Sequence, residues 1–454
     1  MNRVDVLTIA AGGILAIARF AEPHADAHTE NGSAATKAAP SASPSTSAST
    51  STSPSTSTCP PPKPIPPLTA TPDDPPQPAI EQPDALAPFF ARLAELARGR
   101  AKSHVRIAVY GDSNGTRDFM TGEMRRVLQR TYGDGGHGFV TVGRPWRWHS
   151  FMDIKHDTRT ETWGSYTVTS APAPDNFHGH GLIAAFSIQT GATTWIATAD
   201  DDAPIGRSAS RFDVHYLEQP RGGTFEVRVD GATMASANTR APRAGAGFLE
   251  VRVPDGPHKL DIVATSPFQT RILGVTVERD TPSVIVDGIG VGMLNCQWIL
   301  RDDEALNRAT LARRDYDLVV FHLGTLSNAA DYAPCMDKLL ARHRAALPHA
   351  SYLVLSPPDF LEDRFFPPRP APWVPLVRDA QRAYTSTHGV AFWDFFAAMG
   401  GSGSMSRFER EGMTIKDGVH FSAKGGAYMG DRVVDAIARG FDAYLREHPD
   451  AGCE

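Results

Sequence analysis

The sequence predicts an α/β domain with a five-stranded parallel sheet, interrupted by an inserted antiparallel β-sandwich. Two observations support this fold class. On both sides of the middle region, apolar runs bounded by glycine alternate with segments of helical periodicity, which is the pattern of a parallel sheet covered by helices on both faces. Between about residues 155 and 280 the pattern changes to short period-two runs separated by Gly, Pro and Asp, which is typical of an antiparallel sandwich.

The composition is that of a globular protein. Of the 454 residues, 41% are hydrophobic and 21% are charged. The formal net charge is −6 and the basic residues are scattered, so there is no reason to expect nucleic-acid binding. We divide the chain into residues 1–27, 28–83, 84–154, 155–280, 281–447 and a tail, 448–454.

The first 27 residues resemble a secretory signal. Arg3 precedes an apolar run from Val6 to Ala18, and Ala25-Asp26-Ala27 forms an A-x-A site. The apolar run is short for a membrane span. We therefore expect export to the periplasm, the cell envelope or the medium, and an uncleaved N-terminal anchor that tethers the protein to a membrane stays open as an alternative.

Residues 28–83 are mostly Ser, Thr, Ala and Pro. Such a segment buries too little apolar surface to offset the entropy of ordering it. We expect a disordered linker, stiffened by its prolines, that gives a catalytic domain reach toward a large polymer.

The first part of the α/β domain, 84–154, begins with a helix over 84–98 whose apolar residues recur at helical spacing. A buried strand follows at 105–110, and a second helix is expected over 116–131. The second part, 281–447, supplies the remaining elements. Its expected strands are 283–287, 316–323, 351–355 and 390–393, and its expected helices lie near 302–313, 331–346, 373–388 and 423–445.

The inserted region shows its clearest strand patterns at five places, 165–169, 194–198, 212–217, 224–231 and 248–253. The four cysteines have no metal-ligand spacing. Cys59 and Cys453 lie in the tails. Cys296 and Cys335 fit either one disulfide in an oxidising compartment or two separate buried thiols.

Ser113 stands at the turn between the first strand and the following helix, in the sequence Gly111-Asp112-Ser113. Chemistry in open α/β sheets collects at the carboxyl ends of strands, so this serine is a candidate nucleophile, although the same residues also form an ordinary helix cap. Asp417 and His420 precede the last helix. They supply the orienting carboxylate and the base that a serine nucleophile needs.

An early Gly-Asp-Ser and a late Asp-x-x-His resemble the SGNH (GDSL) hydrolase superfamily, which has a flavodoxin-like three-layer fold. The segments 118–122, 132–139, 391–394 and 398–401 are similar to the bacterial branch that includes peptidoglycan O-acetylesterases. That resemblance implies a jelly-roll, carbohydrate-module-like insertion after the first strand and helix. It also implies a triad of Ser113, Asp417 and His420.

The resemblance further implies an oxyanion hole in which the N–H of Ser113 acts with a glycine N–H and an asparagine side chain. The loop after the second strand places Met293 where that glycine is expected, next to Gly292, and Leu326 stands where the asparagine is expected. Loss of one donor typically lowers the rate about 100- to 1,000-fold. Replacement by the Met293 N–H and by Asn328 or Asn295 is the expected remedy.

Two aromatic residues, Trp146 and Trp148, follow the Gly-rich segment after the serine. They are candidates for stacking on a sugar ring, and packing in the core is the alternative. His322, inside the third expected strand, is interpreted as a core histidine.

The leading hypothesis is an exported serine esterase that removes O-acetyl groups from peptidoglycan or another extracellular polysaccharide. It requires no metal, no organic cofactor and no obligate protein partner. A non-catalytic glycan-binding protein on a hydrolase fold and a polysaccharide O-acetyltransferase are the alternatives.

Overall fold

The computed structural model describes residues 59–69, 74–157, 159–362 and 367–453. The expected signal, 1–27, and the linker up to residue 58 lie outside these residues. Within the described ranges, no helix is both long enough and apolar enough to cross a bilayer.

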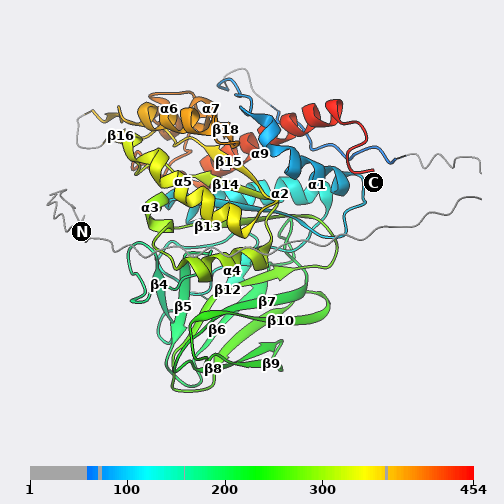
Figure 1. Cartoon of the computed structure of the whole chain (residues 1–454), viewed down its shortest axis with the longest axis vertical. Helices are drawn as coiled ribbons and strands as arrows, with labels where there is room; N and C mark the ends of the chain where they lie inside the picture. The colour runs from blue at the N-terminus through cyan, green and yellow to red at the C-terminus, as the bar shows by residue number, and fades with distance from the viewer. Residues whose placement is uncertain (1–58, 70–73, 158, 363–366, 454) are drawn as a thin grey trace, which may run out of the picture. The chain divides into compact units, whose positions relative to one another are not determined.

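Five parallel strands form the central sheet, in the order β13-β1-β14-β15-β18 (Figure 1). They are β1 (Val105–Gly111), β13 (Val284–Gly290), β14 (Leu318–His322), β15 (Ser351–Leu355) and β18 (Ala391–Trp393). Their side chains are almost all buried, because helices cover both faces of the sheet. The predicted fold class, a parallel α/β domain with a separate antiparallel unit, is confirmed.

The helices belong to two hydrophobic layers, one on each face of the sheet. Val105, Ile107 and Val109 of β1 point into the layer with α1, α2 and α9, while Ala108 and Tyr110 point into the layer with α4, α5 and α6. The helices are α1 (Ala87–Ala97), α2 (Phe119–Tyr132), α3 (Cys296–Ile299), α4 (Glu304–Arg314), α5 (Ala329–Ala346), α6 (Val374–Thr385), α7 (Phe395–Met399), α8 (Ser404–Arg410) and α9 (Ala423–Glu447). The first and the last of them lie side by side (Figure 1, blue and red).

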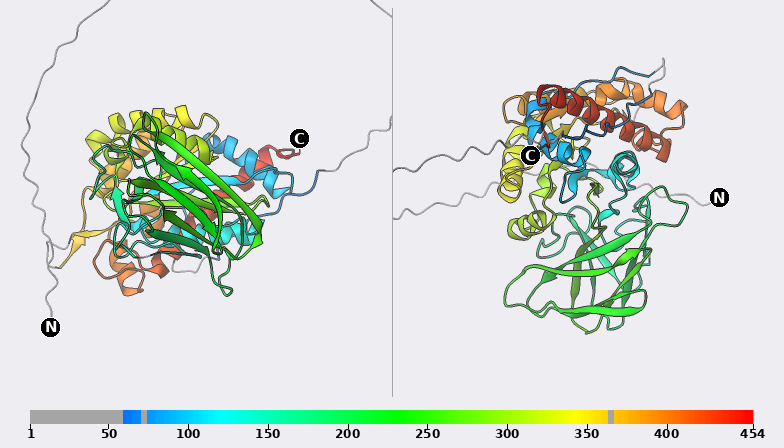
Figure 2. Two further views of the ribbon diagram at one scale, coloured as in Figure 1. Left: turned by 90° about the horizontal axis from the view of Figure 1, so that it is seen from below. Right: turned by 90° about the vertical axis from the view of Figure 1, so that its right-hand side faces the viewer.

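The inserted unit is a sandwich of two antiparallel sheets (Figure 2). One sheet has the order β10-β7-β12-β5-β4, with β2 paired to β12, and the other has the order β3-β6-β11-β8-β9. The strands are β2 (Gly138–Val140), β3 (Ile154–His156), β4 (Gly164–Thr167), β5 (Ile183–Ser187), β6 (Thr193–Thr198), β7 (Ala209–Glu218), β8 (Thr224–Val229), β9 (Ala232–Asn238), β10 (Gly245–Gly256), β11 (Lys259–Ala264) and β12 (Thr270–Glu278). A two-residue ladder, β16 (Leu361–Glu362) with β17 (Arg369–Pro370), lies apart.

The sandwich begins earlier than the expected boundary at residue 155. The strand β2 pairs antiparallel with β12, with Val140 opposite Val275. The chain therefore enters and leaves the insertion through two adjacent strands of one sheet. Three residues are too few to show period-two alternation, which is why the sequence pattern missed β2.

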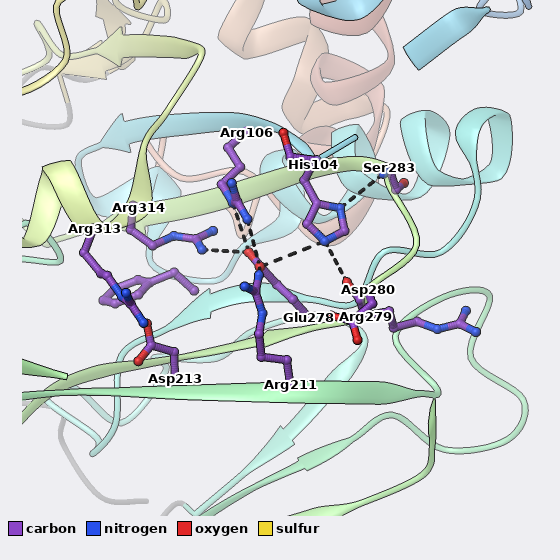
Figure 3. Close-up of polar contacts among 12 residues, drawn as sticks. His104, Arg106, Arg211, Asp213, Glu278, Arg279, Asp280, Ser283, Arg313 and Arg314 are labelled. Atoms are coloured by element: carbon purple, nitrogen blue, oxygen red, sulfur yellow. Dashed lines mark hydrogen bonds and ion pairs between the residues drawn. The ribbon is translucent and has the colours of Figure 1, made fainter. Parts of the chain in front are cut away.

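A buried network of charges joins the sandwich to the α/β domain (Figure 3). Glu278, at the end of β12, receives hydrogen bonds from Arg106 of β1 at 3.1 and 3.2 Å and from Arg314, the last residue of α4, at 2.7 Å, and it also pairs with Arg211 of β7. Burial alone would raise the pKa of Glu278, but Arg314 and Arg106 hold it well below its ordinary value. The carboxylate is therefore charged and shared by both units.

The last part of the expected disordered linker is ordered instead. Residues 59–69 and 74–81 run along the α/β domain without forming a helix or strand of their own, and Lys63 N donates to Ala97 O at 2.8 Å while Leu68 N donates to Asp435 Oδ1 at 3.1 Å. Glu81 exchanges two backbone hydrogen bonds with Phe392 and so covers the edge strand β18. Partners far along the chain supply the order, and composition alone does not reveal them.

Both cysteine pairs form disulfides. Cys59 bonds to Cys453, which fixes the start of the ordered N-terminal segment to the end of the chain. Cys296 bonds to Cys335 and joins α3 to α5. The disulfide reading of Cys296 and Cys335 holds, and two separate thiols are excluded.

The charge network yields a stability prediction. Glu278→Ala removes the carboxylate that Arg106, Arg211 and Arg314 share. It should therefore lower the free energy of unfolding by about 3–5 kcal/mol in urea denaturation. Glu226→Ala removes a half-exposed partner of Arg228 on the sandwich surface and should cost at most about 1 kcal/mol. Equal losses in the two variants would show that the network does not stabilise the junction.

Candidate active site

Ser113 lies where β1 ends, at the carboxyl edge of the parallel sheet. Gly111, the last residue of β1, pairs with Gly290 of β13 and His322 of β14. A single 3₁₀ turn, Ser113–Gly115, follows, and the Asp112 side chain caps it by accepting a hydrogen bond from Asn114 N at 3.1 Å. The serine thus heads a tight turn between strand and helix, where its hydroxyl is accessible.

This turn packs directly on the end of β13. A Cβ atom at position 290 would lie 2.1 Å from the carbonyl carbon of Gly115, so only glycine fits. Val291 N donates to Gly111 O at 3.0 Å just beyond this contact. The loop after β13 is therefore held beside the nucleophile turn.

The structure brings the three predicted catalytic side chains together. His420 Nε2 lies 2.8 Å from Ser113 Oγ, and His420 Nδ1 lies 2.6 Å from Asp417 Oδ2. The other Asp417 oxygen accepts the backbone N–H groups of Val419 and His420 at 3.0 and 2.8 Å. A hydroxyl, a base within hydrogen-bond reach and an orienting carboxylate are the parts that nucleophilic acyl transfer needs.

Asn114 joins the two halves of this site, and sequence reasoning missed it. Its Oδ1 accepts a hydrogen bond from Phe421 N at 2.9 Å, and its Nδ2 donates to Val419 O at 3.3 Å. The two bonds hold the backbone on both sides of His420 in place. The position of Asn114 next to the serine was the only signal in the sequence, because its partners lie more than 300 residues away.

A buried ion pair below the turn fixes its other end. Asp118 and Arg125 pair at 2.9 Å, and Arg125 also donates to Val286 O of β13. Asp118 further accepts hydrogen bonds from Thr121 Oγ1 and Met152 N. Burial acts to raise the pKa of Asp118, but Arg125 and His137 together more than offset it, so the pKa lies well below its ordinary value and the carboxylate stays charged.

The Asp417 carboxylate raises the pKa of His420. The hydrogen bond to Asp417 raises the pKa of His420 above 6.5, against the opposing effect of burial. Burial acts to raise the pKa of Asp417, but the hydrogen bonds from His420 and from two backbone amides lower it to about 2. Asp417 is therefore an anion at neutral pH and stabilises the imidazolium that forms when His420 accepts a proton.

A pocket of about 370 Å³ opens over the triad. Its lining residues are Ser113, Asn114, Thr116, Arg117, Phe119, Trp148, Ile415, Asp417, His420 and Phe421. Trp148 is 51% exposed and forms one wall, as a sugar-stacking residue would. Trp146 is half-buried instead and packs close to Gly292. The two tryptophans thus have different positions, and only Trp148 lines the pocket.

The backbone donors expected for an oxyanion hole are free. Met293 has a left-handed φ of +65°, which turns the loop after β13. Within the described part of the chain, the N–H groups of Ser113, Gly292 and Met293 donate no backbone hydrogen bond. Having no backbone acceptor is a condition that an oxyanion donor must meet, and these three groups meet it.

The two asparagines expected to replace the missing side-chain donor cap helices instead. Asn328 Oδ1 accepts from Ala330 N at 3.0 Å at the start of α5, and Asn295 Oδ1 accepts from Trp298 N at 3.0 Å at the start of α3. Neither lines the pocket. The proposed place of Asn328 in the oxyanion hole is corrected to a cap, for which Asn is among the preferred residues.

His322 is buried against Phe395, with the two ring centroids 4.3 Å apart, and burial lowers its pKa to about 4. It is a neutral core histidine. Among the described residues, no group of three or more His, Cys, Asp or Glu side chains is arranged to hold a metal ion.

The two hydrogen bonds of the Asn114 side chain can be tested with a matched control. Asn114→Ala removes both bonds that hold the His420 loop to the serine turn, so turnover of a small acetyl ester should fall on the order of 10- to 100-fold. Asn328→Ala removes only a helix cap and should leave turnover within about twofold, with a loss of about 1 kcal/mol of stability. A larger loss of turnover in Asn328→Ala would indicate that Asn328 does act as an oxyanion donor.

The pKa of His420 yields a pH prediction. His420 acts as base when neutral, so kcat/KM should rise with pH through a midpoint above 6.5. Asp417→Asn removes the anion that raises this pKa, so the midpoint should move to lower pH while the maximal rate drops by about 10,000-fold. A pH–rate profile measures both, and an unchanged midpoint would contradict the coupling between Asp417 and His420.

Comparison with known proteins supports the fold described above. A solved structure of a peptidoglycan O-acetylesterase is 25% identical to the chain, with a TM-score of 0.65, over 78% of this chain and 96% of that one. Two family two carbohydrate esterases, from Clostridium thermocellum and Cellvibrio japonicus, are 11% and 10% identical with TM-scores of 0.24 each. They cover 61% and 64% of this chain and 98% of each of those chains.

No protein-family model and no curated protein sequence matches the chain. The fold, the order of the sequence motifs and the similarity to the esterase structure nevertheless agree with one another. The chain has the fold of the SGNH/GDSL hydrolase superfamily with an inserted β-sandwich, and it is similar to the peptidoglycan O-acetylesterase of that superfamily.

Proposed function

We propose that the protein is an exported serine esterase that removes O-acetyl groups from peptidoglycan or another extracellular polysaccharide. The observation that carries the proposal is the continuous hydrogen-bonded chain from Ser113 Oγ through His420 to Asp417, at the floor of an open pocket. A protein that only binds glycans has no need of this arrangement.

In the proposed reaction, Ser113 Oγ attacks the acetyl carbonyl carbon while His420 Nε2 takes the hydroxyl proton. The negative charge that develops on the carbonyl oxygen is met by the N–H groups of Ser113 and of the Gly292–Met293 loop. The tetrahedral intermediate then collapses, the C–O bond to the sugar breaks, and His420 returns the proton to the departing sugar oxygen. Acetyl-Ser113 remains.

The second half of the reaction repeats these roles. Water gives its proton to His420 and attacks the acyl carbon, and collapse releases acetate and restores the serine hydroxyl. A sugar hydroxyl in place of water would make the same protein a transferase. The openness of the site to solvent supports hydrolysis, since the His420 side chain is 35% exposed.

The substrate class is supported by the pocket and by the similarity to the peptidoglycan O-acetylesterase. Trp148 offers an exposed aromatic face beside the triad, which suits a sugar ring. Export is supported by the signal-like N-terminus and by the cysteines, because all four are paired in disulfides, which persist in oxidising compartments.

The test is acetate release from O-acetylated peptidoglycan and from a small aryl acetate. Ser113→Ala should lower kcat/KM by at least about 1,000-fold, because it removes the nucleophile. Ser386→Ala, which changes an exposed serine at the end of α6, is the matched control and should keep the wild-type rate.

Wild-type protein that releases no more acetate than Ser113→Ala from either substrate would overturn the esterase proposal, and the glycan-binding alternative would replace it. Adding an unacetylated saccharide acceptor separates the two acyl-transfer reactions. An esterase keeps releasing free acetate, whereas a transferase moves the acetyl group to the acceptor.

A further inference from the structure

One wall of the pocket over the triad contains a positively charged side chain that the acyl-transfer chemistry does not use. Arg117 lines this pocket together with Ser113 and His420. Its guanidinium carbon lies 5.5 Å from the centroid of the Phe119 ring, which is also part of the pocket wall. Within the described residues, the guanidinium donates no hydrogen bond and forms no ion pair. Its five N–H donors are therefore available to a ligand.

The backbone that carries Arg117 is fixed on both sides. Thr116 Oγ1 donates to Ser113 O at 2.7 Å, and Thr116 O accepts from Ser150 N at 3.2 Å. On the other side, Asp118 N donates to Gly115 O at 3.2 Å, and its carboxylate is held in the buried pair with Arg125. The Cα atom of Arg117 is thus fixed relative to the nucleophile, and the contact of its guanidinium with the Phe119 ring keeps the cation on the pocket wall.

The pocket contains no carboxylate that can satisfy Arg117. Asp417 is the acidic residue among the lining residues, and its two oxygens are taken by the His420 ring and by two backbone amides. The other walls are mainly apolar and include Phe119, Trp148 and Ile415. An unpaired arginine among apolar walls favours an anion on the ligand, because the guanidinium fork matches a carboxylate with two parallel hydrogen bonds.

We propose that the natural substrate is an acidic saccharide in which a carboxylate near the acetylated position pairs with Arg117 while a sugar ring stacks on Trp148. This inference rests on the proposed esterase function and narrows its substrate class. A carboxylate fits better than a phosphate, because one cation neutralises a monoanion, whereas a dianion would keep an excess charge beside the Asp417 carboxylate.

The test compares two acetylated substrates that differ only in the carboxylate. One is an O-acetylated hexuronate oligosaccharide, and the other is the corresponding neutral hexose oligosaccharide with acetyl groups at the same positions. Wild-type protein should prefer the acidic substrate in kcat/KM on the order of 10- to 100-fold, mostly through KM. Added salt should weaken this preference, because the pocket is open to solvent.

Arg117→Gln should abolish the preference, so that the ratio of the two kcat/KM values approaches one. Arg117→Lys keeps the charge without the fork and should retain part of the preference. Arg147→Gln is the matched control, since Arg147 is exposed and lies outside the pocket lining, and it should keep the full preference.

Equal kcat/KM values for the two substrates in the wild type, or an undiminished preference in Arg117→Gln, would overturn the assignment of Arg117. If the protein is not an esterase at all, a different result is expected. In that case neither oligosaccharide nor a neutral aryl acetate would be hydrolysed faster by the wild type than by Ser113→Ala, and the inference about Arg117 would fall with it.

Discussion

The architecture depends on the buried carboxylate of Asp287, at the middle of β13. It accepts a hydrogen bond from Phe139 N of β2 at 2.8 Å and from the Tyr316 hydroxyl at 2.8 Å, and it pairs with Arg314 at 2.6 Å. The same Arg314 binds Glu278 at the end of the insertion. One carboxylate therefore ties the first strand of the sandwich, the strand that follows the sandwich and the end of α4 into one junction.

This junction matters for the site because β13 runs from Asp287 straight to the nucleophile turn. Three residues after Asp287, Gly290 packs on Gly115, and the next residues form the loop with the free N–H groups of Gly292 and Met293. Anchoring the insertion thus fixes the expected oxyanion donors relative to Ser113. Asn114 does the same for the other half of the site, because it holds the His420 loop from the serine side. The geometry of the triad is set by contacts between segments that are far apart in the sequence.

Sequence patterns predicted those helices and strands whose apolar residues recur with the period of the element that they form. The five parallel strands and the long helices all show such patterns, and the triad follows from two short motifs at opposite ends of the chain. The strand β12 was not among the clearest examples, because all of its side chains are buried and it therefore shows no alternation. Residues 59–69 and 74–83 were expected to be disordered because their order comes from the Cys59–Cys453 disulfide and from hydrogen bonds to distant helices, which the composition does not show.

The site also shows where residue type alone was insufficient. Asn328 was a candidate oxyanion donor, yet it precedes Ala-Ala-Asp at the start of a helix, and that is the pattern of a cap. Asn114 and Arg117 carry no motif of their own. Their roles appear only when the strand ends and the C-terminal loop are brought together, because a hydrogen-bond partner or an unpaired charge is a property of the folded chain.

The central claim is that Ser113 becomes acetylated during turnover, and mass spectrometry of the acid-quenched enzyme tests it most directly. After mixing with excess aryl acetate, we expect one added acetyl group that peptide mapping places on Ser113, and no addition in Ser113→Ala. Free acetate should form as the acetyl group is lost from the wild type. Acetylation of another residue, or acetate release with no acetyl-enzyme in wild type and equal release by Ser113→Ala, would show that Ser113 is not the nucleophile.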